Sequence, residues 1–199
     1  MKRYLITALA AAMLQSCAWI DEVGQPDSKA EFRLEDAQSD DTALACPTIQ
    51  FPLKFDFFDI DTPDESITTI GMYANYPDIM TSQYALITFV PTDAQTLEAC
   101  PPPTELAGTT QPLTRDGCVR MAIQINACDP KITARVIGTL TLDAFSPERG
   151  KRVEGKVEGK VIYFEQVNTA TETRERQTEI GTVEGEFSFV NHAGAVWNI

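Results

Sequence analysis

Cysteines are the residues of this chain whose spacing says most about its chemistry. Cys46, Cys100, Cys118 and Cys128 follow a fifth cysteine near the N-terminus. An even number of cysteines in an oxidising compartment predicts two disulfides, although four cysteines allow three pairings. We favour Cys100–Cys118, which closes the long loop between these residues, together with Cys46–Cys128, which pins the first strand to the middle of the domain.

Other chemistry has little support in the sequence. No Cys-x-x-Cys pair is present, which disfavours a four-cysteine zinc site. A nucleophilic cysteine needs a histidine partner, and the single histidine, His192, lies far along the chain in a segment typical of a turn. A Gly-x-Ser-x-Gly elbow, a P-loop and a dinucleotide fingerprint are all missing. We therefore expect no catalytic residue and no cofactor, and favour a protein that is not an enzyme.

A group of carboxylates, namely Asp59, Asp61, Asp64 and Glu65, falls in a segment that we expect to be a turn. Hard oxygen ligands within a short loop suit Ca²⁺. The segment lacks the glycine and the terminal glutamate of an EF-hand loop, and a solvated acidic turn explains the same residues. Both interpretations stay open from the sequence.

The N-terminus has the features of a targeting signal. Met1 to Arg3 is basic, and Tyr4 to Leu14 is an apolar run of signal-peptide length that is too short to cross a bilayer. Leu14-Gln15-Ser16-Cys17 then resembles the lipobox of bacterial lipoproteins. The resemblance implies that residues 1–16 are a signal peptide, that Cys17 becomes the mature N-terminus, and that its sulfur carries a diacylglycerol. Ala18, where an aspartate would mark retention at the inner membrane, implies the outer membrane.

Residues 17–45 are rich in acidic side chains and poor in apolar ones. This composition predicts a flexible tether that holds the following domain away from an anionic surface. A short helix from Ser28 to Ala37 is an alternative, because Ser28 and Glu31 have the spacing of a capping box. A single domain is expected to occupy residues 46–199.

The net charge of the chain is −13. Nucleic acid is disfavoured as a partner because phosphate binding needs a basic face. Electrostatic docking on anionic lipid is disfavoured for the same reason. We expect contact with the membrane only through the N-terminal lipid, and an envelope protein or a glycan as a further partner.

The segment Arg152–Phe164 has a period of two. Valine, glycine and tyrosine occupy every second position from Val153 to Tyr163, and glutamate and lysine fill most positions between them. This alternation predicts a β-strand with one buried face. Similar alternation covers 131–145 and 182–190. The turn signal Ser146–Gly150 predicts that 132–145 and 152–166 form an antiparallel hairpin, whereas 168–178 is read as a polar loop or a strand extension.

Further strands are expected over 48–60, 66–74, 84–90 and 119–125. Pro52 makes the first of these an edge strand, and the third, apolar on both faces, is expected to be central. Residues 92–117 form a long loop. About seven strands with turns between them and no convincing helix within the domain predict an all-β fold, either an antiparallel β-sandwich or a small β-barrel.

Glycines at 138, 155, 159 and 185 lie where an inward side chain is expected. Glycine weakens a strand unless the freed space is used. Three uses are open: strong local curvature, a ligand close to the backbone, or aromatic side chains packed over the gap. The candidate aromatic residues are Phe55, Tyr163, Phe187 and Phe189.

These observations favour a lipid-anchored protein of the bacterial cell envelope with a binding or structural role. One alternative is a lipid-anchored hydrolase that uses paired carboxylates to cleave glycans, which needs no histidine. Another is a carrier of small ligands of the calycin type, since a barrel with glycines on one face can enclose a cavity. Two carboxylates facing each other in a pocket would favour the hydrolase, and an apolar internal cavity the carrier.

Overall fold

The computed structural model describes residues 28–36, 51–55, 57–64, 67–74, 83–125, 132–168 and 172–191. Within these ranges one sheet contains ten strands. The strands are β1 (Lys29–Asp36), β2 (Phe51–Phe55), β3 (Phe57–Asp64), β4 (Ile67–Ala74), β5 (Gln83–Phe89), β6 (Thr109–Leu113), β7 (Val119–Ile125), β8 (Ile132–Ala144), β9 (Arg152–Asn168) and β10 (Thr173–Val190). A single helical turn, α2 (Pro103–Leu106), precedes β6.

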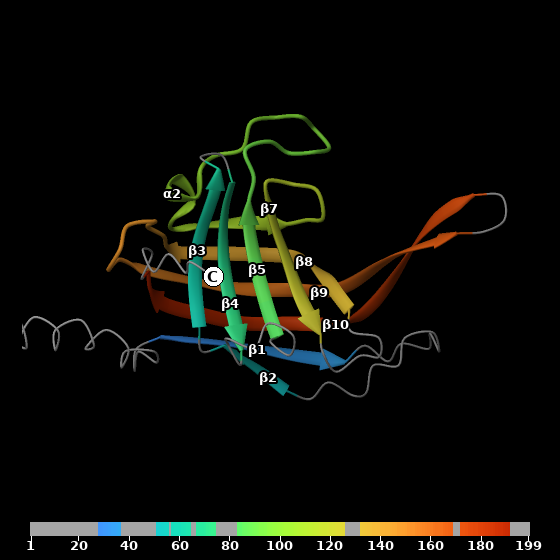
Figure 1. Ribbon diagram of the computed structural model, residues 1–199, viewed down its shortest axis with the longest axis horizontal. Helices are drawn as coiled ribbons and strands as arrows, with labels where there is room; N and C mark the ends of the chain where they lie inside the picture. Colours follow the sequence, from blue (N-terminus) through green and yellow to red (C-terminus); the bar gives the residue numbers. More distant parts are fainter. Residues whose placement is uncertain are drawn as a thin grey trace, which may run out of the picture.

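The order across the sheet is β2-β1-β10-β9-β8-β6-β7-β5-β4-β3, with β8 also paired to β7. Neighbours are antiparallel apart from a parallel contact between β6 and β7. Strands β3, β4, β5 and β7 run steeply across β8, β9 and β10 in Figure 1. The all-β, antiparallel prediction is confirmed. The sheet is open, so the prediction of a small closed barrel is wrong, and it has ten strands where the turn signals predict about seven.

The core lies between the two groups of strands that cross each other, β3, β4, β5 and β7 on one side and β8, β9 and β10 on the other. Within the body of the sheet, apolar residues at alternate positions of β8, β9 and β10 are buried, as the period of two predicts. Phe58 of β3 stacks on Phe189 of β10 with ring centroids 4.8 Å apart. Because β3 lies at one end of the sheet order and β10 near the other, this contact shows that the sheet folds over to bury one continuous core.

Gly138 and Gly159 lie opposite each other on β8 and β9. A Cβ atom on Gly138 would lie 2.1 Å from the carbonyl oxygen of Glu158, so no larger residue fits without moving backbone. Here β8 changes its second neighbour from β7, beside Ile132–Val136, to β6, beside Gly138–Leu142. These two glycines therefore allow the backbones of β8 and β9 to lie close together where the sheet changes direction.

The other two glycines lie beneath aromatic rings. Phe187 covers Gly155, its cross-strand partner, and Phe32 covers Gly185 in the same way. The prediction of aromatic packing is confirmed for these two glycines. Phe187 is one of the proposed residues, whereas Phe32 belongs to a segment that the sequence interpretation places outside the domain.

The hairpin of β8 and β9 is confirmed, and so are the strands at 67–74, 83–89 and 119–125. Strand β5 lies between β4 and β7, as expected for a central strand. The single strand predicted over 48–60 is wrong, because β2 and β3 occupy opposite edges of the sheet. Pro52 does lie on an edge strand, since β2 pairs with β1 alone among the described strands.

Three further expectations are corrected. Lys29–Asp36 is strand β1 between β2 and β10, and is neither a helix nor part of a tether. Residues 92–117 contain α2 and β6 and are not a loop throughout. Residues 59–64 belong to strand β3 and are not a turn.

Candidate functional site

A charged groove crosses the outer face of β1, β10, β9 and β8. Its main hollow is open to solvent and has a volume of about 570 Å³, and a second hollow of about 340 Å³ continues it along β1, β10 and β9. The inward residues of these strands are apolar and fill the core, so the alternating outward residues line the groove. The charged residues among the lining are Lys29, Glu31, Arg33, Glu35, Lys156, Glu158, Lys160, Glu184 and Glu186.

Strand register arranges these side chains in rows. One row runs from Glu31 through Glu186 and Lys156 to Thr141. The next row runs from Arg33 through Glu184 and Glu158 to Thr139. Residues directly opposite on one face have Cβ atoms about 5 Å apart. In each row, three charged side chains therefore lie next to one another, close enough for neighbours to interact electrostatically.

Charges at the ends of the groove are paired within the protein. Lys29 Nζ donates to Glu186 Oε1 at 2.8 Å, and Lys160 Nζ donates to Glu179 Oε2 at 2.9 Å. The hydrogen bond from Lys29 and the charges of Lys29 and Lys156 lower the pKa of the Glu186 carboxyl. The same hydrogen bond raises the pKa of the Lys29 ammonium. These pairs are exposed, so they orient side chains more than they stabilise the fold.

Charges in the centre of the groove are not paired in this way. Arg33, Glu184 and Glu158 form no side-chain hydrogen bond or ion pair with any residue in the described part of the chain. Glu184 and Glu158 lie directly opposite each other on β10 and β9. Like charges in this position repel, so a bound cationic group between them would be stabilising.

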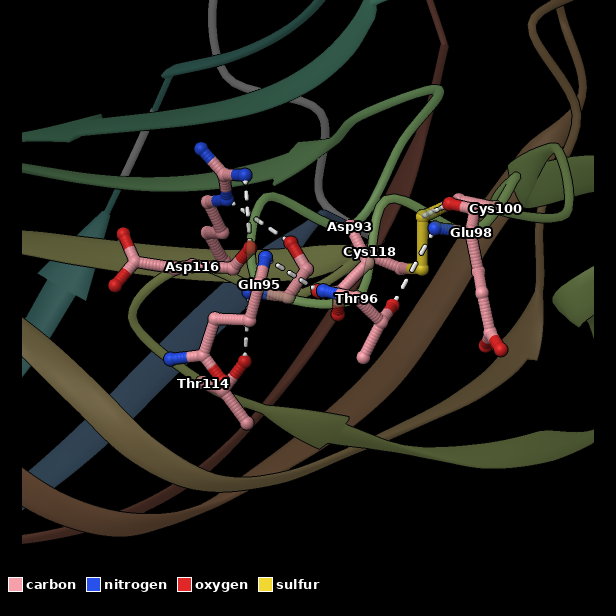
Figure 2. The surroundings of a disulfide bond; sticks show 10 residues. Asp93, Gln95, Thr96, Glu98, Cys100, Thr114, Asp116 and Cys118 are labelled. Carbon is pink, nitrogen blue, oxygen red and sulfur yellow. Dashed lines mark hydrogen bonds between the residues drawn. A yellow bond between two sulfur atoms is a disulfide. The ribbon is translucent and has the colours of Figure 1, made fainter.

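The disulfide between Cys100 and Cys118 confirms the favoured pairing, with Cα atoms 5.5 Å apart (Figure 2). It joins the chain that leaves β5 to the chain that enters β7. Between Pro91 and Cys100 the backbone makes a tight excursion closed by the bridge Thr92–Ala99. At its tip Leu97 has a φ of 60° and is 79% exposed.

Polar groups hold the chain around this disulfide in Figure 2. The Asp93 carboxylate accepts hydrogen bonds from the amides of Thr96 and Gln95 at 2.9 and 2.8 Å, which lowers the pKa of Asp93. Arg120 donates to the carbonyl oxygens of Gly117 and Asp116 at 2.9 and 3.0 Å. Because these groups satisfy one another, we assign the segment a structural role and take the groove as the candidate site.

Only part of the predicted calcium site lies within the described residues, so the site remains a prediction. Asp59 and Asp61 are two residues apart on the edge strand β3, and Asp64 ends that strand. Partial burial and the charge of Asp61 raise the pKa of the Asp59 carboxyl. Glu65 lies outside the described residues. Across the residues that the structure describes, no three His, Cys, Asp or Glu side chains are placed to hold a metal ion.

Several predicted residues lie outside the described ranges, namely Cys17, Cys46, Cys128 and His192. Lipidation of Cys17 and the second disulfide therefore remain predictions. None of the helices in the described ranges is long and apolar enough to span a membrane.

The sequence analysis does not identify three groove residues of β1, namely Lys29, Glu31 and Arg33, as part of a site, because it assigns them to the tether. A signal for them exists, because Ala30, Phe32 and Leu34 alternate with charged residues over the whole of β1. The alternation is short, whereas the capping-box spacing favours a helix and the acidic composition favours a tether, so the strand is not predicted. The partners of these residues across the sheet depend on strand register, which no single segment reveals.

The chain matches no protein-family model, no curated protein and no solved structure.

Proposed function

We propose that this chain is a lipid-anchored protein of the bacterial cell envelope that binds a partner protein through the charged groove and catalyses no reaction. The Leu14–Cys17 motif after a basic and apolar start supports the anchor. The hollow across β1, β10, β9 and β8 supports the binding role. The outer membrane is the proposed location, on the basis of Ala18.

The observation that carries the binding role is the set of charges in the centre of the groove, Arg33, Glu158 and Glu184, that form no ion pair with another described residue. A lysine or arginine of the partner would lie between Glu158 and Glu184, and a carboxylate of the partner would pair with Arg33. A protein surface offers both kinds of group. A neutral glycan fits less well, because the lining contains no aromatic ring on which a sugar could stack.

The anchor would also keep the groove near the membrane. Lys29, at one end of the groove, follows Cys17 by twelve residues. A chain of this length spans at most about 40 Å when fully extended. The expected partner is therefore a protein that reaches the same membrane surface.

The anchor is tested by the intact mass of the protein isolated from native membranes. We expect a chain that begins at Cys17 and carries diacylglycerol, with no free thiol. A Cys17→Ser variant should leave the membrane fraction. A native chain that still begins at Met1 and has no lipid would overturn the anchor and leave the groove to be judged separately.

The groove is tested by placing a photo-crosslinking amino acid at Thr139 in the full-length protein in its native cells. We expect one discrete adduct that is lost in Glu158→Lys and Glu184→Lys variants. The matched control is Lys151→Glu, an exposed charge reversal on the turn before β9. An adduct unaffected by the groove variants, or lost equally in the control, would contradict the proposal.

A second candidate function rests on the facing carboxylates of Glu158 and Glu184. Retaining glycosidases hold two carboxyl groups about 5 Å apart. Both glutamates are exposed, whereas the acid of such an enzyme needs an apolar pocket that shields it from water. Release of reducing sugar from cell-wall glycan by the wild type, and its loss in both Glu158→Gln and Glu184→Gln, would establish the hydrolase in place of the binding role.

The carrier of small ligands is not supported by the described structure. A calycin encloses its ligand in a closed barrel, whereas this sheet is open and its inward face is filled by side chains.

A further inference from the structure

Strands β9 and β10 continue beyond the sheet as a two-stranded arm. They pair along their whole length, from Arg152–Val190 to Asn168–Thr173. Among the described residues, β8 pairs with β9 only as far as Ile162, and β1 pairs with β10 only from Gly181 onward. Figure 1 shows the arm leaving the body of the sheet on the side away from the turn between β8 and β9.

Side-chain contacts between the arm and the segment before Cys118, and between the two strands of the arm, hold the arm in place. Arg115, in the segment that ends at Cys118, lies over the ring of Phe164 at 4.6 Å from the centroid. Its guanidinium also pairs with Glu175 of the opposite strand at 2.5 Å. Within the arm, Glu165 accepts two hydrogen bonds from Arg176, its cross-strand partner. A bare two-stranded ribbon is marginal in water, so these contacts preorganise an element that would otherwise fray.

The outer edge of β9 in the arm differs from the two edges of the sheet. Strand β2 carries Pro52, and strand β3 carries Pro63 together with Asp59 and Asp61. Proline and charge are common devices against unwanted strand pairing. The edge segment 163–167 has the sequence YFEQV, with no proline, no glycine and one charge, which Arg176 already neutralises.

We propose that this edge, residues 163–167 of β9, is a docking site for an extended strand of a partner protein, which would add to the arm as a third strand. Such a strand would gain backbone hydrogen bonds along the edge. It would also contact Tyr163 and Val167 on one face of the arm and Phe164 on the opposite face. Its matching side chains are uncharged and β-branched or aromatic, since such pairs stabilise adjacent strands.

Charge argues against a second copy of the chain as the occupant. Each copy has a net charge of −13, so two copies repel. The proposal depends neither on the lipid anchor nor on the charged groove, because the edge of the arm is a separate surface.

The test uses the full-length protein and a defined probe, a capped eight-residue peptide of alternating threonine and valine with a lysine at each end. We expect the peptide to bind and to slow amide hydrogen exchange over 163–167. The matched control peptide has the same sequence with alternate backbone nitrogens methylated. Because methylation removes the donors of one edge, we expect it to weaken binding at least tenfold.

Two neighbouring proline variants locate the edge. Backbone N–H groups of adjacent residues in a strand point to opposite sides, so one of Gln166→Pro and Val167→Pro removes a donor on the open edge and the other disrupts pairing with β10. We expect one variant to keep exchange protection in β10 while losing at least tenfold in peptide affinity.

The proposal is overturned if the threonine–valine peptide leaves exchange over 163–167 unchanged, or binds both proline variants as tightly as the wild type. It is also overturned if light scattering gives twice the mass of the chain and a proline variant restores the monomer, since the occupant is then a second copy.

Discussion

The β8–β9 hairpin and the segment from Val90 to Cys118 are held in opposite ways. In the hairpin, apolar residues at every second position are buried, and glycines allow close packing. In the segment, Leu106 and Leu113 are the large apolar side chains that are buried, and a disulfide and hydrogen bonds hold the rest. We infer that the stability of the hairpin depends on how well its buried side chains fill the available volume. The structure of the segment depends instead on one disulfide and a few polar contacts.

The largest expected effect comes from adding one methyl group to the hairpin. In Gly138→Ala the Cβ would lie 2.1 Å from the carbonyl oxygen of Glu158 and 2.5 Å from Cα of Gly159. Both obstacles are backbone, so β8 and β9 must separate. We expect a loss of more than about 4 kcal/mol in the free energy of unfolding, measured by denaturant titration, or failure to fold.

The control for this variant is Gly150→Ala in the turn between β8 and β9. Gly150 has a φ of 78° and no atom within 4 Å of an added Cβ, so the substitution costs only backbone strain of about 1 kcal/mol. Equal losses in the two variants would show that close approach of β8 and β9 is not what Gly138 provides.

A second test removes volume from the same region. Phe187 is 1% exposed and covers Gly155, so Phe187→Ala leaves a cavity that the glycine cannot fill. We expect a loss of about 3–5 kcal/mol in the free energy of unfolding. The control is Ser188→Ala, at the next residue of β10, whose side chain points away from the core. A loss below about 1 kcal/mol for Phe187→Ala would mean that the ring is not part of a packed core.

Sequence periodicity predicts the hairpin well because its structure follows from burial at every second position. Periodicity fails over 48–60, where one apolar run hides two strands. The signal is a change of phase, since Leu53 and Phe55 are buried at odd positions but Ile60 at an even one. A continuous run of alternation therefore needs to be checked for phase as well as for period.

The segment 90–118 is less predictable because its contacts are not periodic. The pairing of Cys100 with Cys118 can be inferred from spacing, but β6 depends on pairing with β8 far along the chain. The groove has the same limitation, since the approach of Arg33, Glu184 and Glu158 is set by the register of three strands.

Removing the disulfide should affect the segment and spare the hairpin. The bridged cysteines are 18 residues apart, and closing a loop of this size stabilises a fold by about 3 kcal/mol in the chain-entropy model. For the Cys100→Ser/Cys118→Ser double variant we expect a loss of about this size. Hydrogen exchange should rise over 91–118 before it rises in β9. Uniform loss of protection across β8 and β9 would contradict a division between the two regions.

Acid should give the smallest effect, and again in the segment. The amides of Thr96 and Gln95 lower the pKa of the Asp93 carboxyl below its usual value, and the Thr96 hydroxyl and Arg120 act in the same direction. A lowered pKa in the folded state adds stability that is complete above the unfolded pKa of about 4 and is lost as pH falls through the folded value. We therefore expect exchange at Gln95 and Thr96 to increase below about pH 4, after correction for the intrinsic rate, while β9 stays protected. Asp93→Asn should remove this pH dependence, whereas the exposed Asp143→Asn on β8 should retain it. If Asp93→Asn keeps the wild-type profile, another group controls the acid response and the carboxylate does not hold the excursion closed.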